Sequence, residues 1–170
     1  MISLDTISSA YDMHARELFA FVMRFVANQE AAEDLLHDVF VKLMKYSEKE
    51  HVTDSNIRAL LYQISRTVCL DYLRSSAHTK VTAVSDDYIS SFPDSRGEGD
   101  EIEELRAAIR DIVSSMGEPA KSVFIMKNDR GLTFEEVAAA LDTSVRTAKR
   151  RMNDAMNYMA GELRKRGLGW

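Results

Sequence analysis

The sequence contains few of the residues that interrupt helices or cross-link a chain. Two prolines, seven glycines and one cysteine occur among its 170 residues. A single cysteine cannot form a disulfide within the chain, and Cys69 lies in an apolar helical pattern, which predicts a small core residue rather than a nucleophile. No alternating run of β-branched residues reaches strand length between turn signals. These absences predict an all-α fold.

Long apolar runs are missing as well. No stretch of about 18 apolar residues occurs, and the N-terminal sequence MISLDTISSAYD lacks the basic start and apolar segment of a signal peptide. We therefore expect a cytoplasmic protein with no membrane insertion. A nucleophile, a base and an orienting group cannot be assembled from the remaining residues, so we also expect no enzymatic activity and no cofactor.

Two pairs of carboxylate and histidine are spaced by three residues, Asp34 with His37 and Glu48 with His51. Similar pairs occur in helix bundles that bind two metal ions. The second pair lies in a polar stretch without an apolar period, and no further carboxylates at inward positions accompany the pairs. We expect no metal site, which a metal assay on the purified protein would check.

Apolar residues at helical spacing divide the chain into two parts. Three amphipathic periods fall within residues 3–79, and others follow residue 101. Between them the chain is rich in Ser, Asp and Gly and has no sustained apolar period. We predict two small helical domains, residues 1–79 and 101–170, joined by a flexible acidic linker, residues 80–100. The linker is either a solvated spacer or an acidic strand that occupies a cationic channel on a partner.

The carboxylates of the linker and of the residues just after it give the formal net charge of −5 a local source. A cluster of cations elsewhere is therefore compatible with an acidic protein. That cluster follows the sequence TFEEVAAALDTS, in which Thr133 and Glu136 have the spacing of a capping box. The corner Asp142-Thr143-Ser144 comes next, and Ser144 is placed to cap a second helix.

One side of this second helix is apolar and the other is cationic. The apolar stripe is expected to be buried: Val145, Ala148, Met152, Ala155, Met156 and Met159. Unpaired cations cannot point inward, because burying them costs too much free energy. The ordinary interpretation of such a charge run is a solvated helix face. A capping box, a corner and a cationic second helix in register instead favour a helix-turn-helix, whose second helix enters the DNA major groove.

This pattern gives a set of candidate DNA contacts: Ser144, Arg146, Thr147, Lys149, Arg150, Arg151 and Asn153. Arg146 is near the helix start and is the candidate for a base contact, whereas Lys149 and Arg150 suit either bases or phosphates. Arg151 lies further round the helix, where it would meet the DNA backbone or its own domain.

The helix expected over residues 56–74 has two apolar faces, which is typical of a helix that is central or bound to a partner. A narrow polar strip runs between those faces. Its residues are candidates for binding a nucleic-acid strand, with structural polar roles as the alternative at each position: Asn56, Gln63, Arg66, Thr67 and Arg74.

Three segments together resemble a known family. AEDLLHDVFVKLMK (residues 32–45) and NIRALLYQISRTVCLDYLR (residues 56–74) are similar to domain two of bacterial sigma factors of the extracytoplasmic-function type, in the sigma-70 family. Residues 117–163 resemble domain four of the same family. Asp142 stands where the family usually has glycine in the helix-turn-helix corner, and aspartate tolerates the left-handed backbone required there.

The resemblance implies a function for each part. Domain two would bind core RNA polymerase and melt and read the minus-ten promoter element, with residues 46–56 as the loop that holds unstacked bases. Domain four would read the minus-thirty-five element. The core-binding face would carry Asp34, Asp38, Val41 and Lys45, for which a solvated acidic patch is the alternative. The family also implies control by an anti-sigma factor. The rival hypothesis is a helix-turn-helix regulator that acts without polymerase.

Overall fold

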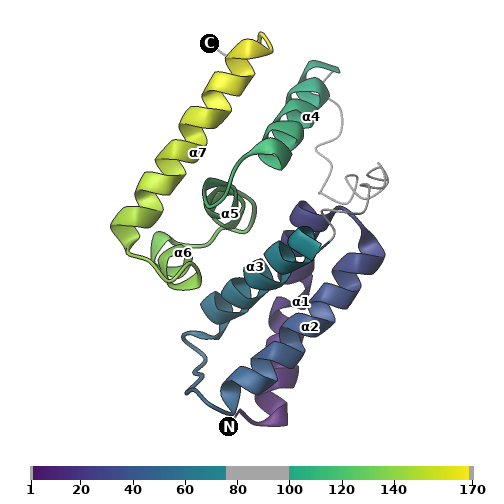
Figure 1. Ribbon diagram of the computed structural model, residues 1–170, viewed down its shortest axis with the longest axis vertical. Helices are drawn as coiled ribbons and strands as arrows, with labels where there is room; N and C mark the ends of the chain where they lie inside the picture. The colour runs from purple at the N-terminus through teal and green to yellow at the C-terminus, as the bar shows by residue number, and fades with distance from the viewer. Residues whose placement is uncertain (1, 76–99, 169–170) are drawn as a thin grey trace.

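The computed structural model describes residues 2–75 and 100–168 (Figure 1). Within those residues the regular structure is entirely helical, so the predicted all-α class is confirmed. The predicted linker lies outside the described residues, apart from Asp100, which begins a helix. None of the described helices combines the length and apolar character needed to cross a membrane.

The N-terminal half consists of α1 (Leu4–Val26), α2 (Gln29–Ser47) and α3 (Ile57–Ser75). The Ser3 hydroxyl accepts a hydrogen bond from the Thr6 N–H at 3.1 Å, and the Asn28 side chain caps α2 in the same way at 2.9 Å. Ala27, with φ 49°, ends α1 one residue before that second cap. These local signals produce a tight reversal, so that all three helices pack side by side around Phe21, Leu43 and Leu61, which are fully buried.

The C-terminal half consists of α4 (Asp100–Ser115), α5 (Ala120–Phe124), a π-helical turn (Ile125–Asp129), α6 (Phe134–Ala140) and α7 (Val145–Lys165). Carboxylates fill the first turn of α4, where they interact favourably with the positive end of the helix dipole. The acidic stretch of the sequence therefore extends into this helix.

Burial in the C-terminal half is less complete than the apolar periods suggest. Ala108, Ile112 and Val113 of α4 are buried, but Ile102 and Leu105 nearer its start are each 36% exposed. Met156 of α7 was expected in the core and is 47% exposed, so that expectation is wrong. The apolar stripes of α4 and α7 run beyond the length over which neighbouring helices cover them.

The two halves pack against each other along α3. Buried apolar residues from both halves form one continuous cluster, and α6 lies against α3 (Figure 1). Tyr62 and Cys69, on the second apolar face of α3, are both fully buried. Of the two alternatives for α3, central or bound to a partner, the structure shows a central helix, since α1 and α2 cover one side and α6 covers the other. We refer to this packing of the halves as the closed arrangement.

Candidate nucleic-acid interface

Residues 133–165 form a helix-turn-helix whose local geometry follows from three side chains. The Thr133 hydroxyl accepts from the Glu136 N–H at 3.1 Å, and the Glu136 carboxylate accepts from the Thr133 N–H at 2.8 Å. These two bonds complete the expected capping box of α6. Asp142 has φ 51°, in the left-handed region that the corner requires. The predicted capping of α6 and the predicted corner are therefore confirmed.

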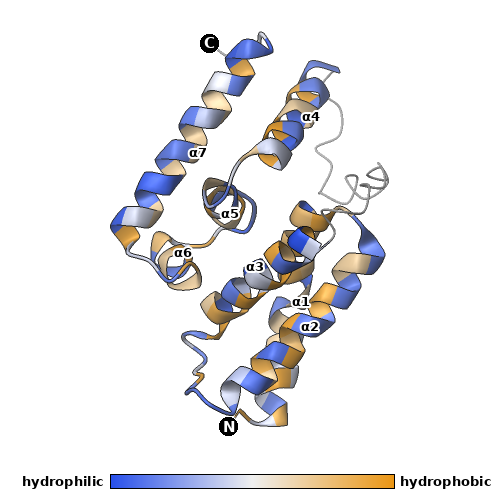
Figure 2. Cartoon of the chain, in the orientation of Figure 1, coloured by the Kyte–Doolittle hydropathy of each residue, from blue (hydrophilic) through white to orange (hydrophobic). Residues whose placement is uncertain are grey.

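The cationic side of α7 faces solvent. Arg146, Lys149, Arg150 and Asn153 are exposed, while Ala148 and Ala155 on the opposite side are fully buried. Figure 2 shows α7 as a largely hydrophilic helix beside more hydrophobic neighbours. The ammonium group of Lys149 lies 5.7 Å from the ring centroid of Phe134 on α6. The structure thus presents a row of cations that can reach a nucleic-acid surface.

Three other residues of the predicted set are placed differently. The Ser144 hydroxyl accepts from the Thr147 N–H at 3.0 Å and donates to the Thr147 hydroxyl at 2.9 Å. Ser144 therefore caps α7, and the hydroxyls of Ser144 and Thr147 are already engaged with each other. Arg151 is half-buried and lines a cleft of about 400 Å³ between the halves, together with Arg66 and Glu118.

Only part of the polar strip of α3 is exposed and accessible to a ligand. Thr67 and Arg74 are exposed and Gln63 is half-buried. The Asn56 side chain accepts from the Thr53 N–H at 2.8 Å, so Asn56 also fixes the loop before α3. Arg66 points into the C-terminal half, where it donates to the Ser122 hydroxyl at 2.9 Å and to Glu118 at 3.1 Å.

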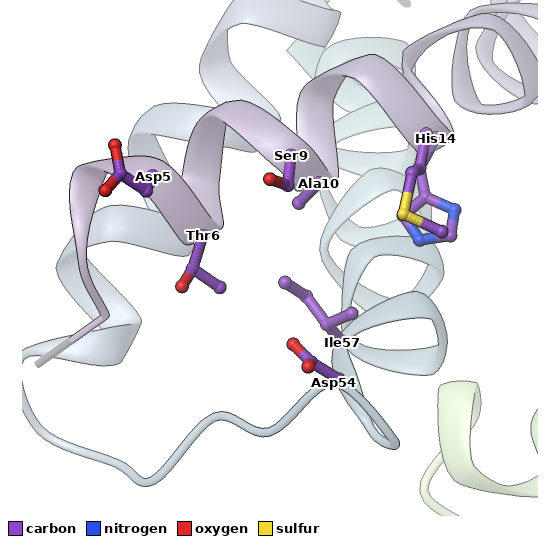
Figure 3. Close-up of a pocket in the computed structure, with 8 residues that line it drawn as sticks. Asp5, Thr6, Ser9, Ala10, His14, Asp54 and Ile57 are labelled. Carbon is purple, nitrogen blue, oxygen red and sulfur yellow. The ribbon is translucent and has the colours of Figure 1, made fainter.

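The loop before α3 borders a pocket of about 360 Å³ (Figure 3). Asp54 and Ile57 contribute one wall, and the first half of α1 contributes the other. Thr6 of α1 points toward the opening on the side where Asp54 lies in this view, whereas the Asp5 carboxylate points away from it. Because α2 ends at Ser47, the loop itself covers residues 48–56, and Tyr46 belongs to the helix.

The predicted core-binding face lies on α2. Asp34, Asp38 and Lys45 are exposed, and Val41 is half-buried between them. Their spacing places all four side chains along one side of the helix. The structure therefore brings them together as one surface, with two carboxylates at one end and a cation at the other.

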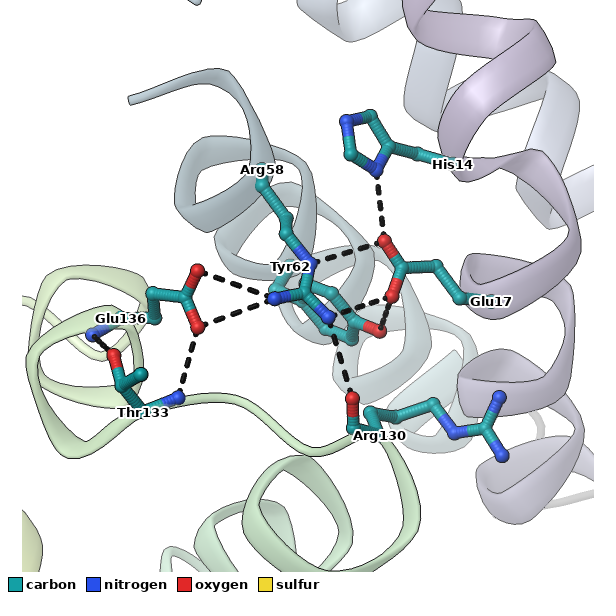
Figure 4. Close-up of polar contacts among 7 residues, drawn as sticks. All are labelled: His14, Glu17, Arg58, Tyr62, Arg130, Thr133 and Glu136. Carbon is teal, nitrogen blue, oxygen red and sulfur yellow. Dashed lines mark hydrogen bonds and ion pairs between the residues drawn. The ribbon is translucent and has the colours of Figure 1, made fainter. Parts of the chain in front are cut away.

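A cluster of polar residues that the sequence did not reveal joins the halves (Figure 4). Arg58 of α3 lies between two carboxylates. Its Nε and Nη2 atoms donate to Glu17 of α1 at 3.1 and 2.9 Å, and its Nη1 atom donates to both oxygens of Glu136 at 3.1 and 3.2 Å. Nη2 also donates to the backbone carbonyl of Arg130 at 3.2 Å. One guanidinium therefore ties α1, α3 and α6 together.

The charged groups in this cluster shift one another's pKa values. Burial raises the pKa of Glu17, but hydrogen bonds from Arg58, His14 and Tyr62 outweigh it and leave that pKa below its ordinary value. The pKa of Glu136 is also lowered, because the Thr133 N–H and Arg58 outweigh its partial burial. Hydrogen bonding to Glu17 raises the pKa of Arg58 above its ordinary value. All three groups are therefore charged near neutral pH.

Two further ion pairs cross between the halves. Arg24 of α1 pairs with Asp129 at 2.7 Å, and Arg66 of α3 pairs with Glu118 at 3.1 Å. The sequence held one signal for this interface. Arg58 precedes Tyr62 by one helical turn, and so lies in the same row as the second apolar face of α3. An arginine next to an apolar face that another element must bury favours a covering element that carries a carboxylate.

A helix-turn-helix with an exposed cationic second helix, packed on a three-helix unit, defines a helical DNA-binding protein. Residues 10–79 match the family model for sigma-70 region 2. The chain is 30% identical to the extracytoplasmic-function sigma factor SigM of Bacillus subtilis over 51% of its own length and 50% of that protein. It is 24% identical to SigL of Mycobacterium tuberculosis over 93% of its length and 89% of SigL.

Among solved structures, the fold is similar to that of the sigma factor RpoE from Bartonella quintana in complex with the anti-sigma factor NepR. The TM-score is 0.67 at 19% identity, over 95% of this chain and 98% of that one. Residues 10–79 therefore carry a sigma-70 region 2, and over most of its length the chain is similar to sigma factors of the extracytoplasmic-function type.

Proposed function

We propose that this chain binds core RNA polymerase and directs promoter-specific initiation as an alternative sigma factor. One observation carries the proposal: a helix-turn-helix with exposed cations lies on the same chain as a match to sigma-70 region 2. In this role the protein acts in the cytoplasm, where it positions polymerase and performs no catalysis of its own. Residues 1–79 serve as domain two, residues 80–100 as the linker and residues 101–170 as domain four.

In domain four, the start of α7 enters the major groove of the minus-thirty-five element. Arg146 and Lys149, one turn apart and exposed, are within reach of base edges or phosphates. The engaged hydroxyls of Ser144 and Thr147 make these two residues positioning groups for the helix start. The N–H groups at that end of the helix also favour a nearby phosphate.

In domain two, Gln63, Thr67 and Arg74 contact the melted strand of the minus-ten element. The pocket between α1 and the loop of residues 48–56 is large enough for an unstacked base. Its Asp54 carboxylate and Thr6 hydroxyl offer acceptors for an exocyclic amino group, which cytosine and adenine carry. This chemistry favours an amino-bearing base in the pocket.

On α2, the surface formed by Asp34, Asp38, Val41 and Lys45 docks on core polymerase. Two carboxylates beside a half-buried valine suit a partner surface that is cationic and partly apolar. This face lies on a different helix from the polar strip of α3, so core binding and strand binding involve separate surfaces.

The closed arrangement cannot read both promoter elements at once. Elements centred roughly 25 base pairs apart are separated by about 85 Å of B-form DNA at ~3.4 Å per pair. A compact chain of this length has a radius of gyration near ~15 Å, which corresponds to a diameter of roughly 40 Å. The halves must therefore separate before the protein engages a whole promoter.

Control by an anti-sigma factor is part of the proposal. The sigma factor RpoE, whose structure resembles this chain across both halves, was solved with an anti-sigma factor bound. A protein that holds the closed arrangement would keep this chain from a promoter, because the halves could not separate.

Run-off transcription with core polymerase on a promoter library tests the function. We expect transcripts from a defined subset of promoters only when this chain is added. DNA binding without any effect on transcription would instead support a helix-turn-helix regulator that acts without polymerase.

A further inference from the structure

Among the described residues, three ion pairs join the halves, and all three have the same polarity. Every cation belongs to the N-terminal half, and every carboxylate belongs to the C-terminal half. We name these sets the arginine cluster (Arg24, Arg58 and Arg66) and the carboxylate cluster (Asp129, Glu136 and Glu118). The side chains are 17–33% exposed, so they lie at the edges of the interface rather than deep within it.

Two members of the arginine cluster, Arg58 and Arg66, lie on α3 beside the strip that we propose to bind single-stranded DNA. Arg66 is three residues from Gln63, a spacing that makes the two side chains neighbours on a helix surface. Arg58 and Arg66 are eight positions apart, or about 12 Å along the helix at 1.5 Å per residue. That distance equals the rise of three to four nucleotides of a B-form strand at ~3.4 Å each.

The Nη1 edge of the Arg58 guanidinium, which Glu136 occupies in the closed arrangement, could bind an external anion once the halves separate. Glu17, from the same half, accepts from Nε and Nη2 and so fixes the orientation of the side chain. Glu136 accepts from Nη1 through both carboxylate oxygens. A phosphate offers equivalent oxygens at equivalent distances, since guanidinium groups bind carboxylates and phosphates in the same geometry.

We propose that the arginine cluster binds backbone phosphates of the melted promoter strand, and that the carboxylate cluster occupies it in the closed arrangement as an intramolecular competitor. The proposal rests on the function proposed above. Separation of the two halves then exposes the phosphate site at the same time. A nucleic-acid strand and the C-terminal half compete for the same three cations, so the free chain has low affinity for single-stranded DNA.

Substituting the carboxylates and substituting the arginines of the same ion pairs have different expected effects on DNA binding if the C-terminal half competes with DNA. The two substitutions would have the same effect if the ion pairs only hold the halves together. Changing the carboxylates (Glu118→Gln, Asp129→Asn and Glu136→Gln) removes the competitor and leaves the phosphate site. Glutamine at position 136 also keeps a capping-box side chain. Changing the arginines (Arg24→Gln, Arg58→Gln and Arg66→Gln) removes the site itself. Glu135→Gln and Arg16→Gln, at exposed positions on α6 and α1, are single-substitution controls for the effect of losing one charge of each sign.

Binding of the full-length variants to a short fluorescein-labelled single-stranded DNA is measured by anisotropy over a sodium chloride series, and small-angle scattering reports the radius of gyration. We expect both sets of changes to increase the radius of gyration. The carboxylate variant should bind DNA about three- to thirtyfold more tightly than the unmodified chain, since three partly exposed ion pairs no longer oppose opening. The arginine variant should gain nothing, and its salt slope should be shallower than that of the carboxylate variant by roughly 0.7 per lost phosphate contact.

Circular dichroism confirms that each variant is folded. Arg66→Gln alone is the milder test, because Arg66 bonds Ser122 and Glu118 of the C-terminal half, whereas Arg58→Gln would also remove the bonds to Glu17 within the N-terminal half. Equal DNA affinity of the carboxylate and arginine variants would overturn the phosphate site. An unchanged radius of gyration and DNA affinity in the carboxylate variant would overturn the competition. Neither readout involves polymerase, so failure of the transcription assay would count against the sigma function alone.

Discussion

Arg58 of α3 and Glu136 of α6 are separated by 78 positions in the sequence, yet the Arg58 Nη1 atom lies 3.1 Å from a Glu136 carboxylate oxygen. Glu136 has two roles, because the same carboxylate accepts from the Thr133 N–H and completes the capping box of the helix-turn-helix. The first helix of the helix-turn-helix and α3 are therefore coupled through one side chain.

The first prediction concerns pH. Glu17 and Glu136 both have pKa values below the ordinary 4.5, so their charged forms stabilise the fold above that pH. This contribution is present above pH ~4.5 and is lost as pH falls through the lowered pKa values. Thermal unfolding from pH 7 to pH 3 should show a falling melting temperature below that point. A variant with Glu17→Gln and Glu136→Gln should be less stable at pH 7 and should lose less on acidification; an identical decline would contradict the assignment.

The second prediction concerns the cationic face of α7. Replacing Arg146 with alanine should remove about 1 to 3 kcal/mol of discrimination between matched and scrambled minus-thirty-five duplexes, if it reads a base. Replacing Lys149 or Arg150 should reduce the salt slope by roughly one unit, if they contact phosphates. Arg164→Ala, an exposed cation at the far end of α7, is the control. Unaltered binding by all three variants would show that this face is only solvated.

The third prediction concerns promoter melting. Gln63→Ala and Thr67→Ala should reduce open-complex formation on a duplex promoter, with a smaller loss on a template already melted across the minus-ten element. Asn56 is a less suitable position, because its side chain also accepts from the Thr53 N–H. Permanganate footprinting measures the melted region. Equal losses on both templates would assign Gln63 and Thr67 a structural role.

The fourth prediction concerns core polymerase. Reversing Asp34 and Asp38 to lysine should weaken association with core polymerase without changing helicity, since both side chains are exposed. Glu30 and Glu33, reversed in the same way, provide a control on the same helix. Association is measured by native gel shift and helicity by circular dichroism. If the Asp34 and Asp38 variant bound core as well as the control did, the docking face would lie elsewhere.

The fifth prediction concerns the corner of the helix-turn-helix. Asp142 has a left-handed backbone, which costs an ordinary side chain roughly 1 to 2 kcal/mol. Asp142→Ala should therefore lower the free energy of unfolding by about 1 kcal/mol, while Asp142→Gly should change it little. Urea denaturation measures both values. A glycine variant that lost as much as the alanine variant would show that the aspartate side chain itself holds the corner.

Local patterns in the sequence were enough to predict the helical class, the caps of α6 and α7 and the corner at Asp142. Each depends on residues within a few positions of one another, so the chain needs no distant contact to specify it. The exposure of Arg146, Lys149 and Arg150 also followed from the sequence, because unpaired cations opposite an apolar stripe cannot be buried.

Burial at the ends of the apolar stripes did not follow from the sequence. Met156 and Leu105 fit their helical periods as well as their buried neighbours do, but whether another helix covers them depends on how far that neighbouring helix extends. Periodicity identifies the face of a helix that can be buried; it does not identify the length of that face that another element reaches.

Only the tertiary structure decided how the halves meet. The second apolar face of α3 indicated a partner, yet nothing local in the sequence pairs Arg24 with Asp129, Arg58 with Glu136 or Arg66 with Glu118. Such pairs join residues far apart in the chain, and many arginines and carboxylates in the sequence would satisfy charge alone. The continuous core around Tyr62 and Cys69 brings these side chains to within 2.7–3.1 Å of one another, because close packing of apolar residues fixes the register of the polar groups at its edge.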